Sequence, residues 1–159
     1  INVLDIGLCR LGIGICYDNL FPEVARVAAL RGAEVYLMPH AARCGKWPSG
    51  RAAQAASITY HKHVWTKVFA SRAYDNGMFV VHCNQAGRAE REVENSHVGG
   101  ILVFDPDGEV MAQSQATRIV EETVIVRLEA AQYEARRQSQ CFMLQTRRPE
   151  LYGEIVRLG

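Results

Sequence analysis

The sequence predicts an α/β fold in which a mixed β-sheet is covered by helices. In the first half of the chain, apolar runs of strand length alternate with segments of helical periodicity. In the second half, the turn signature Pro106-Asp107-Gly108 joins two apolar runs, which indicates an antiparallel pair. A sheet that contains this late hairpin should therefore be mixed.

Four strands and two helices are expected in the first half. The strands are the short apolar runs Val3–Leu8, Leu11–Cys16, Glu34–Met38 and Met78–Cys83. The first helix begins near Pro22, a residue that suits a first helical turn, and ends at Gly32. The second helix runs from about Ala52 to Tyr74 and is closed by Asn76-Gly77. These helices should cover one face of the sheet.

Shorter elements are expected in the second half. The expected strands are Val98–Phe104, Glu109–Gln113 and Thr123–Val126, and a short helix is expected at Ala130–Arg137. The polar segment Arg88–Asn95 is interpreted as an exposed excursion.

Composition argues against several classes of protein. The 18 Lys and Arg residues nearly balance the 17 Asp and Glu residues, so no basic surface favours nucleic acid or an anionic membrane. No apolar run is long enough to span a bilayer. The five cysteines include no C-x-x-C pair, which favours reduced thiols in a cytoplasmic protein over disulfides or zinc. His61 and His63 do not share a helix face, so no metal site is expected there, and both are interpreted as polar residues on the protein surface.

Cys16 is the candidate nucleophile. It stands where a buried strand gives way to a tight turn and then a helix, within Gly12-Ile13-Gly14-Ile15-Cys16-Tyr17-Asp18. The backbone N–H groups that follow, and the start of the helix, offer positive potential to an anion. A cysteine at a strand end can equally be an inert core residue, so the position alone does not decide its role.

The residues around Cys16 resemble the cysteine motif of the nitrilase (carbon–nitrogen hydrolase) superfamily. The motif is Gly14-Ile15-Cys16-Tyr17-Asp18 followed by Phe21-Pro22-Glu23. Further segments similar to the family follow in order: Met38-Pro39-His40-Ala41, Arg72-Ala73 with Asn76-Gly77, Asn84 with Gly87, Asp105-Pro106-Asp107-Gly108 and Arg148-Pro149-Glu150-Leu151-Tyr152. The resemblance covers nearly the whole chain, and it implies that residues 1–159 are the C-terminal portion of a carbon–nitrogen hydrolase domain.

The resemblance implies a fold, a mechanism and site residues. The fold is an αββα sandwich, of which this chain would be an incomplete domain. In the family a Glu–Lys–Cys triad acts, so Cys16 would attack the substrate to form a thioester while the Tyr17 backbone N–H stabilises the oxyanion. Pro39, His40 and Ala41 would contact the substrate. No metal or organic cofactor is implied.

The glutamate and lysine of that triad are expected upstream of the cysteine motif. None of the 15 residues before Cys16 is Lys or Glu, so the chain alone is expected to hydrolyse amides poorly or not at all. The candidates for a substitute are Glu23, Lys46, Lys62 and Lys67. Each belongs to a segment that matches another part of the family pattern, which makes substitution the less favoured interpretation.

The motif reads Cys-Tyr-Asp, whereas family members that hydrolyse nitriles more typically carry Cys-Trp-Glu. The favoured function is therefore hydrolysis of a linear amide or N-carbamoyl compound with release of ammonia. One alternative is a catalytically inactive fragment that acts as a structural or oligomerisation partner. The other alternative is a thiol redox protein. The absence of a second cysteine two or three residues from Cys16 argues against this alternative.

A partner polypeptide is also expected. Without an upstream segment, one sheet edge and part of an apolar face would meet water, which is unfavourable. We therefore expect the chain to pair with that segment, to form a homo-oligomer, or both. A stable monomer in light scattering would contradict this expectation.

Overall fold

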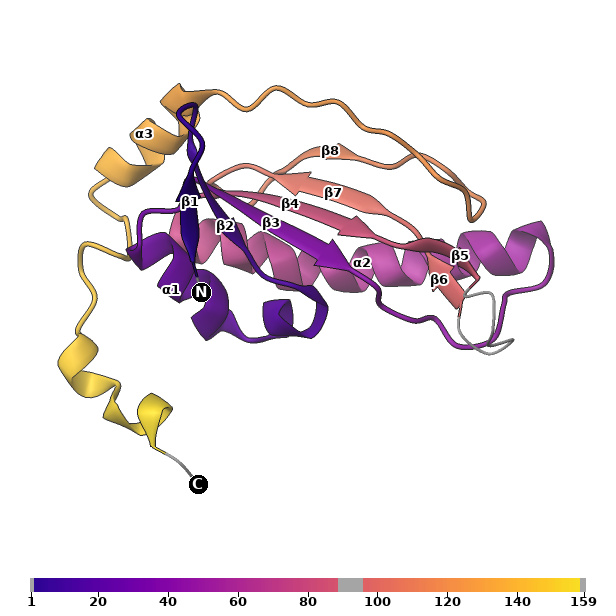
Figure 1. Cartoon of the computed structure of the whole chain (residues 1–159), viewed down its shortest axis with the longest axis horizontal. Coiled ribbons are helices and arrows are strands. Elements are labelled where there is room, and N and C mark those ends of the chain that lie inside the picture. Colours follow the sequence, from indigo (N-terminus) through magenta and orange to yellow (C-terminus); the bar gives the residue numbers. More distant parts are fainter. Residues whose placement is uncertain (1, 89–95, 158–159) are drawn as a thin grey trace.

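Residues 2–88 and 96–157 are described by a computed structural model. Six strands form one sheet in the order β1-β2-β3-β4-β7-β8 (Figure 1). Their bounds are β1 Val3–Asp5, β2 Arg10–Ile13, β3 Val35–His40, β4 Phe79–Asn84, β7 Ile101–Phe104 and β8 Val110–Gln113. Strands β2, β3 and β4 are parallel, whereas the pairs β1·β2, β4·β7 and β7·β8 are antiparallel, so the predicted mixed sheet is confirmed. A separate two-stranded sheet pairs β5 (Ala86–Arg88) with β6 (Ser96–Val98).

Two helices pack on the same face of the six-stranded sheet, as predicted. They are α1 (Pro22–Leu30) and the long α2 (Gly50–Asn76). The remaining helical elements are α3 (Ala130–Gln138) and the 3₁₀ segments η1 (Cys16–Leu20), η2 (Pro149–Leu151) and η3 (Gly153–Val156). No helix in the described ranges combines the length and apolar character needed to cross a membrane.

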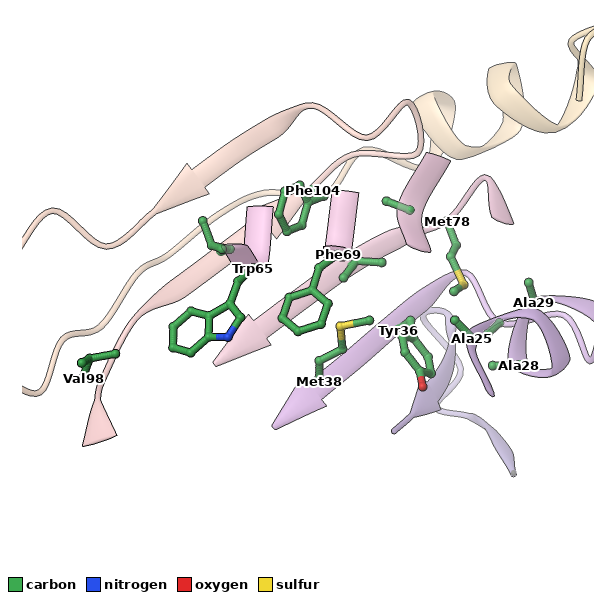
Figure 2. Packing of buried hydrophobic residues seen from close by; sticks show 14 of the residues in the cluster. Ala25, Ala28, Ala29, Tyr36, Met38, Trp65, Phe69, Met78, Val98 and Phe104 are labelled. Carbon is green, nitrogen blue, oxygen red and sulfur yellow. The ribbon is translucent and has the colours of Figure 1, made fainter. Parts of the chain in front are cut away.

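The core lies between this sheet face and the two helices. Tyr36 and Met38 alternate along β3 onto the same face, and Trp65 and Phe69, one turn apart on α2, are buried with them (Figure 2). Gly12 leaves room on β2 for α1, since a Cβ atom there would lie 3.0 Å from the Ala28 Cβ. The small side chains that α1 buries therefore allow a close approach of helix and strand.

The opposite sheet face is apolar and partly uncovered. Leu4 and Ile13 are 60% and 46% exposed, while Val35 and Phe79 are buried near the amino ends of their strands. The sequence predicts such an apolar surface on the early strands. That a second polypeptide covers it remains a prediction.

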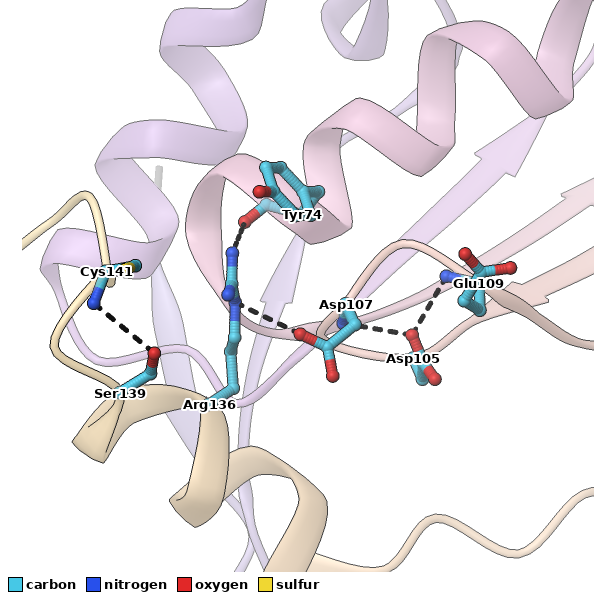
Figure 3. Close-up of polar contacts among 7 residues, drawn as sticks. All are labelled: Tyr74, Asp105, Asp107, Glu109, Arg136, Ser139 and Cys141. Atoms are coloured by element: carbon cyan, nitrogen blue, oxygen red, sulfur yellow. Dashed lines mark hydrogen bonds and ion pairs between the residues drawn. The ribbon is translucent and has the colours of Figure 1, made fainter.

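The C-terminal helix α3 is anchored to the turn between β7 and β8. Arg136 donates to the Tyr74 carbonyl over 3.4 Å, lies over the Tyr74 ring and forms a 3.4 Å ion pair with Asp107 (Figure 3). Within the turn, Asp105 Oδ1 accepts the backbone N–H groups of Asp107 and Glu109, each over 2.9 Å. The predicted hairpin turn is thus confirmed, and through Asp107 it also anchors helix α3.

Several expected elements are wrong in detail. Thr123–Val126 is not a strand; its β-branched residues favour extended backbone, but the segment pairs with no described strand, and Ile125 is 93% exposed. The expected strand Val98–Phe104 is divided between β6 and β7, because Gly99 and Gly100 both adopt positive φ. Cys83, the last residue of the expected strand Met78–Cys83, is exposed, since alternation along β4 turns it away from the helices.

The first two strands are also shorter than expected, ending at Asp5 and Ile13. At Gly7, a positive φ and the hydrogen bond from its N–H to Asp5 Oδ1 end the first strand early. Of the expected excursion Arg88–Asn95, Arg88 belongs to β5, and the other residues lie outside the described ranges.

Candidate active site

The carboxyl ends of the parallel strands β2, β3 and β4 meet at one edge of the sheet. β2 leads to Cys16, β3 ends at His40, and β4 ends at Asn84, which lies opposite His40 in the register. Ligands in α/β sheets bind outside the carboxyl ends of the strands. This edge is therefore the candidate site.

Cys16 occupies a strained turn between β2 and η1. Its φ of 50° is the only positive value of a non-glycine residue in the described part of the chain. The Asp18 carboxylate accepts the Ile15 N–H over 3.2 Å, and the Asp18 N–H donates to the Ile15 carbonyl over 3.1 Å. Asp18 thus orders the turn. A non-glycine residue with positive φ is conformationally constrained, and such residues are common at functional sites.

Cys16 lines a cavity of about 440 Å³ on the helix-covered side of the sheet. The lining residues are Cys16, Tyr17, Leu20, His40, Ala41, Ala42, Arg43, His61 and Trp65. The structure therefore brings His40 and Ala41 to Cys16, as expected. Pro39 does not line the cavity, because alternation along β3 places it on the opposite face from His40.

Tyr17 follows Cys16 and also lines the cavity. The side chain is exposed and meets Phe21 edge to face at 5.5 Å between ring centroids. The Tyr17 N–H lies in the first turn of η1, where N–H groups lack partners within a helix. It is thus suited to bind a developing oxyanion at Cys16.

The loop after β3 is fixed by two buried side chains. Asn84 Oδ1 accepts the Ala42 N–H over 2.8 Å, and Nδ1 of His97 donates to the Ala42 carbonyl over 3.1 Å. The resemblance to the family had pointed to Asn84. Sequence reasoning missed His97, because 55 residues separate it from Ala42 and no local pattern connects them.

His61 and Trp65 were also not expected at the site. His61 is half-buried beside Trp65, with ring centroids 5.4 Å apart, so its interpretation as a surface residue is wrong. The i,i+4 spacing of these residues on α2 puts them on one helix face, and this signal could have found them.

None of the four candidate substitutes for the family's glutamate and lysine lines the Cys16 cavity. Lys62 donates to the Ser114 carbonyl over 2.8 Å, and Glu23 lies at a different cavity, beside Arg26 and Arg72. Among the described residues, no group of three or more His, Cys, Asp and Glu side chains is placed to hold a metal ion.

Behind the cavity, His82 is fully buried among aromatic rings. Its centroid lies 4.7 Å from that of Trp65 and 4.9 Å from those of Phe69 and His40, and neither ring nitrogen has a hydrogen-bond partner. Burial, and secondarily repulsion from His40, lowers the pKa of His82 to about 3. The ring is therefore neutral in the folded protein at ordinary pH.

His82 should make the protein acid-sensitive. The pKa of His82 is lower in the folded state than its ordinary value of 6.5. The contribution of neutral His82 to the free energy of unfolding is therefore complete above pH 6.5 and is lost as pH falls toward 3. Between pH 7 and pH 5 we expect the free energy of unfolding to fall by roughly 2 kcal/mol from this residue. Denaturant titrations of wild type and His82→Phe at both pH values measure the difference. The exposed His63→Gln is the control, and equal pH dependence in wild type and His82→Phe would contradict the prediction.

Comparison with known proteins gives a consistent picture. The model of the carbon–nitrogen hydrolase family matches residues 1–138. A citrullinase from Francisella tularensis is 31% identical over 157 residues, which cover 98% of this chain and 51% of that protein. The crystal structure of Nit3 from Saccharomyces cerevisiae, a nitrilase-superfamily member named as an omega-amidase, superposes with a TM-score of 0.69 at 27% identity. That match covers 92% of this chain and 47% of Nit3.

A second solved structure bears on the cysteine. It is a variant of the amidase from Nesterenkonia sp. AN1, with the acetamide moiety of fluoroacetamide added covalently at the active-site cysteine. The TM-score is 0.64 at 27% identity, over 96% of this chain and 46% of that one. The chain thus spans about half the length of the relatives it matches.

Proposed function

Because the chain belongs to the carbon–nitrogen hydrolase family, we propose that it carries the nucleophile of an amidase that hydrolyses a linear amide or N-carbamoyl compound and releases ammonia. The observation that carries the proposal is Cys16, in a positive-φ turn at the carboxyl end of a parallel strand and on the wall of a cavity. The amidase relatives support this class of reaction.

The proposed reaction has two steps. The thiolate of Cys16 attacks the amide carbon, an S–C bond forms, and the C–N bond breaks as the nitrogen takes up a proton and leaves as ammonia. Water then cleaves the thioester, which frees the acid, or the carbamate where an N-carbamoyl group is the substrate, and restores the thiol. The Tyr17 N–H would stabilise the oxyanion of each tetrahedral intermediate.

The substrate would bind along the loop after β3. His40 and Ala41 line the cavity with Cys16, which supports their predicted contact with substrate. Pro39 would act by shaping the end of β3, since it lies on the other face of the sheet.

The chain would work with a second polypeptide segment or a second copy of itself. The exposed apolar side chains of Leu4 and Ile13 support this part of the proposal, because such a surface is unfavourable in water. All five cysteines are unpaired, which supports a reducing compartment such as the cytoplasm.

One alternative has a specific observation in its favour. None of the residues described around the Cys16 cavity is Glu or Lys, and a thiol without a base is a poor nucleophile at neutral pH. A catalytically inactive protein that contributes an oligomerisation surface would also show these features.

Fluoroacetamide separates the two functions. In the proposed enzyme, the Cys16 thiolate displaces fluoride, so peptide mass spectrometry should find an acetamide adduct on Cys16. The exposed cysteines, Cys83 and Cys141, serve as internal controls for non-specific alkylation. Labelling of these two at the rate of Cys16, without ammonia release from any linear amide or N-carbamoyl compound, would favour the inactive alternative.

A further inference from the structure

Asn19 is the buried residue of the turn that carries Cys16. Among the five residues of η1, all of which the structure describes, Asn19 alone is buried. The apolar side chains of Tyr17 and Leu20, by contrast, are exposed. A buried amide is unfavourable unless it is hydrogen-bonded, and apolar residues are the usual choice for such a position. The burial of Asn19 therefore draws attention to its hydrogen bonds.

The Asn19 amide bonds to three groups. Its Nδ2 lies 2.8 Å from the Gly14 carbonyl oxygen and 2.9 Å from Nε2 of His40. Its Oδ1 accepts the Tyr36 hydroxyl over 3.0 Å. A carbonyl oxygen can only accept, so the NH₂ group must face Gly14, and this fixes the orientation of the amide. Both N–H groups and the oxygen of Asn19 thus have partners.

These bonds connect the turn of the candidate nucleophile to β3. Gly14 follows the last residue of β2 and stands two residues before the cysteine. Its N–H donates to the Leu37 carbonyl over 3.1 Å, and its carbonyl accepts from Asn19. Tyr36 and His40 both belong to β3, and their even spacing places them on one face of the sheet. The amide therefore attaches the turn to this face of β3 at two places.

Asp18 orders the same turn in a different way. Its exposed carboxylate accepts the Ile15 N–H, only three residues away. Such a local bond shapes the turn but does not fix its place relative to the sheet. Cys16 requires both, because a non-glycine residue with a φ of 50° persists only where its surroundings determine its conformation. Asn19 supplies the bonds to the sheet.

The bond to His40 reaches the wall of the Cys16 cavity. His40 lines the cavity together with Cys16, whereas Asn19 does not. The rings of Phe69 and His82 pack against the His40 ring, with centroids 5.1 and 4.9 Å away. One buried amide thus links the turn of the nucleophile to a cavity residue that is itself held by packing.

We propose that Asn19 is a positioning residue for the Cys16 nucleophile, whose turn it fixes in place relative to β3 and His40. The proposal rests on the amidase function proposed for the same cavity. Asn19 acts through Gly14 and His40 rather than on the substrate, because it does not line the cavity. An error of about 1 Å in the place of a reacting group can lower a rate a hundredfold. Loss of the amide should therefore slow the reaction of Cys16 more than it weakens the binding of the reagent.

Fluoroacetamide tests this role in the protein as expressed from its own gene. Asn19→Leu keeps a similar side-chain volume and removes all three hydrogen bonds. We expect the maximal rate at which fluoroacetamide labels Cys16 to fall roughly tenfold to a hundredfold. The reagent concentration that gives half of this rate should change less. Peptide mass spectrometry at several times and concentrations measures both quantities, and labelling of Asn19→Leu at the wild-type rate would overturn the proposal.

Asn76→Leu is the matched control. Asn76 is also buried, and its Nδ2 donates to the Arg72 carbonyl over 2.8 Å, so the substitution removes a similar bond. Asn76 does not line the Cys16 cavity. Both variants should unfold at a lower denaturant concentration than the wild type, but only Asn19→Leu should slow the labelling. Equal slowing in the two variants would show a general loss of stability and would contradict a positioning role.

A measurement on the wild type covers the case in which Asn19→Leu does not fold. The NH₂ group of Asn19 cannot accept a hydrogen bond, so Nε2 of His40 must be the accepting, unprotonated nitrogen. Nitrogen-15 NMR distinguishes protonated from unprotonated ring nitrogens, and we expect an unprotonated Nε2 at neutral pH. A protonated Nε2 would remove the link between Asn19 and His40 and would overturn the proposal.

Failure of the proposed function would be visible separately, as a wild type in which fluoroacetamide does not label Cys16. The backbone chemical shifts of Cys16, which depend on its φ, then still test the positioning role. These shifts should change in Asn19→Leu and remain as in the wild type in Asn76→Leu. Unchanged shifts in Asn19→Leu would show that the turn does not depend on Asn19.

Discussion

Replacing Cys16 by alanine is expected to lower kcat/KM for amide hydrolysis by about four powers of ten or more. Alanine cannot form the thioester, so the reaction falls back on direct attack by water in a site organised for a thiol. Steady-state ammonia release by the protein as expressed from its own gene measures the effect. Cys141→Ala is the control, because this thiol is exposed and does not line the Cys16 cavity. A Cys16→Ala variant that kept a tenth of the activity would refute the assignment of the nucleophile.

A related prediction concerns the amidase activity of the 159-residue chain without any other polypeptide. The cavity lining described here contains no Glu or Lys to take the proton of Cys16 or to stabilise an oxyanion. We therefore expect the chain alone to release ammonia from amides slowly or not at all. Robust release that disappears in Cys16→Ala would show instead that another residue of this chain is the base.

Gly14→Ala is expected to have the largest effect on stability. A Cβ atom at this position would lie under 3.0 Å from both the Tyr36 hydroxyl and the Asn19 amide oxygen, closer than real Cβ atoms approach. Both groups are buried and bonded to each other, so the methyl group must break their hydrogen bond or displace the Cys16 turn. Overpacking together with a lost buried hydrogen bond should reduce the free energy of unfolding by about 3–5 kcal/mol.

Chemical denaturation monitored by circular dichroism measures this loss. The matched control is Gly153→Ala, because nothing lies within 4 Å of the Cβ position there. The control should unfold at the wild-type midpoint. If Gly14→Ala were as stable as the control, the packing described beneath the Cys16 turn would be wrong.

Much of the fold could be predicted because its signals are local. Pro22 begins α1, Gly77 in the left-handed region ends α2, and the Asp105–Gly108 turn joins β7 to β8, all from residues close in sequence. Thr123–Val126 shows the limit of such reasoning. Its composition suits a strand, but a strand exists only where a neighbouring strand can pair with it.

The candidate site shows the same division. Cys16 and its turn could be identified from seven consecutive residues, and His40 and Ala41 from a short segment after the next strand. His61, Trp65 and His97 reach the site from distant segments, and no local pattern marks His97. Of these, the i,i+4 pair on α2 came nearest to being predictable.

By itself, the sequence determined the α/β class, the position of the candidate nucleophile and the family to which the chain belongs, because each depends on contiguous residues. Only the tertiary structure decided which groups meet beneath the Cys16 turn and at the ring of His40. The Gly14 carbonyl, the Asn19 amide and the Tyr36 hydroxyl come together there from distant parts of the chain. The direction of a hydrogen bond is fixed by all of its partners together, and the fold alone brings them into contact.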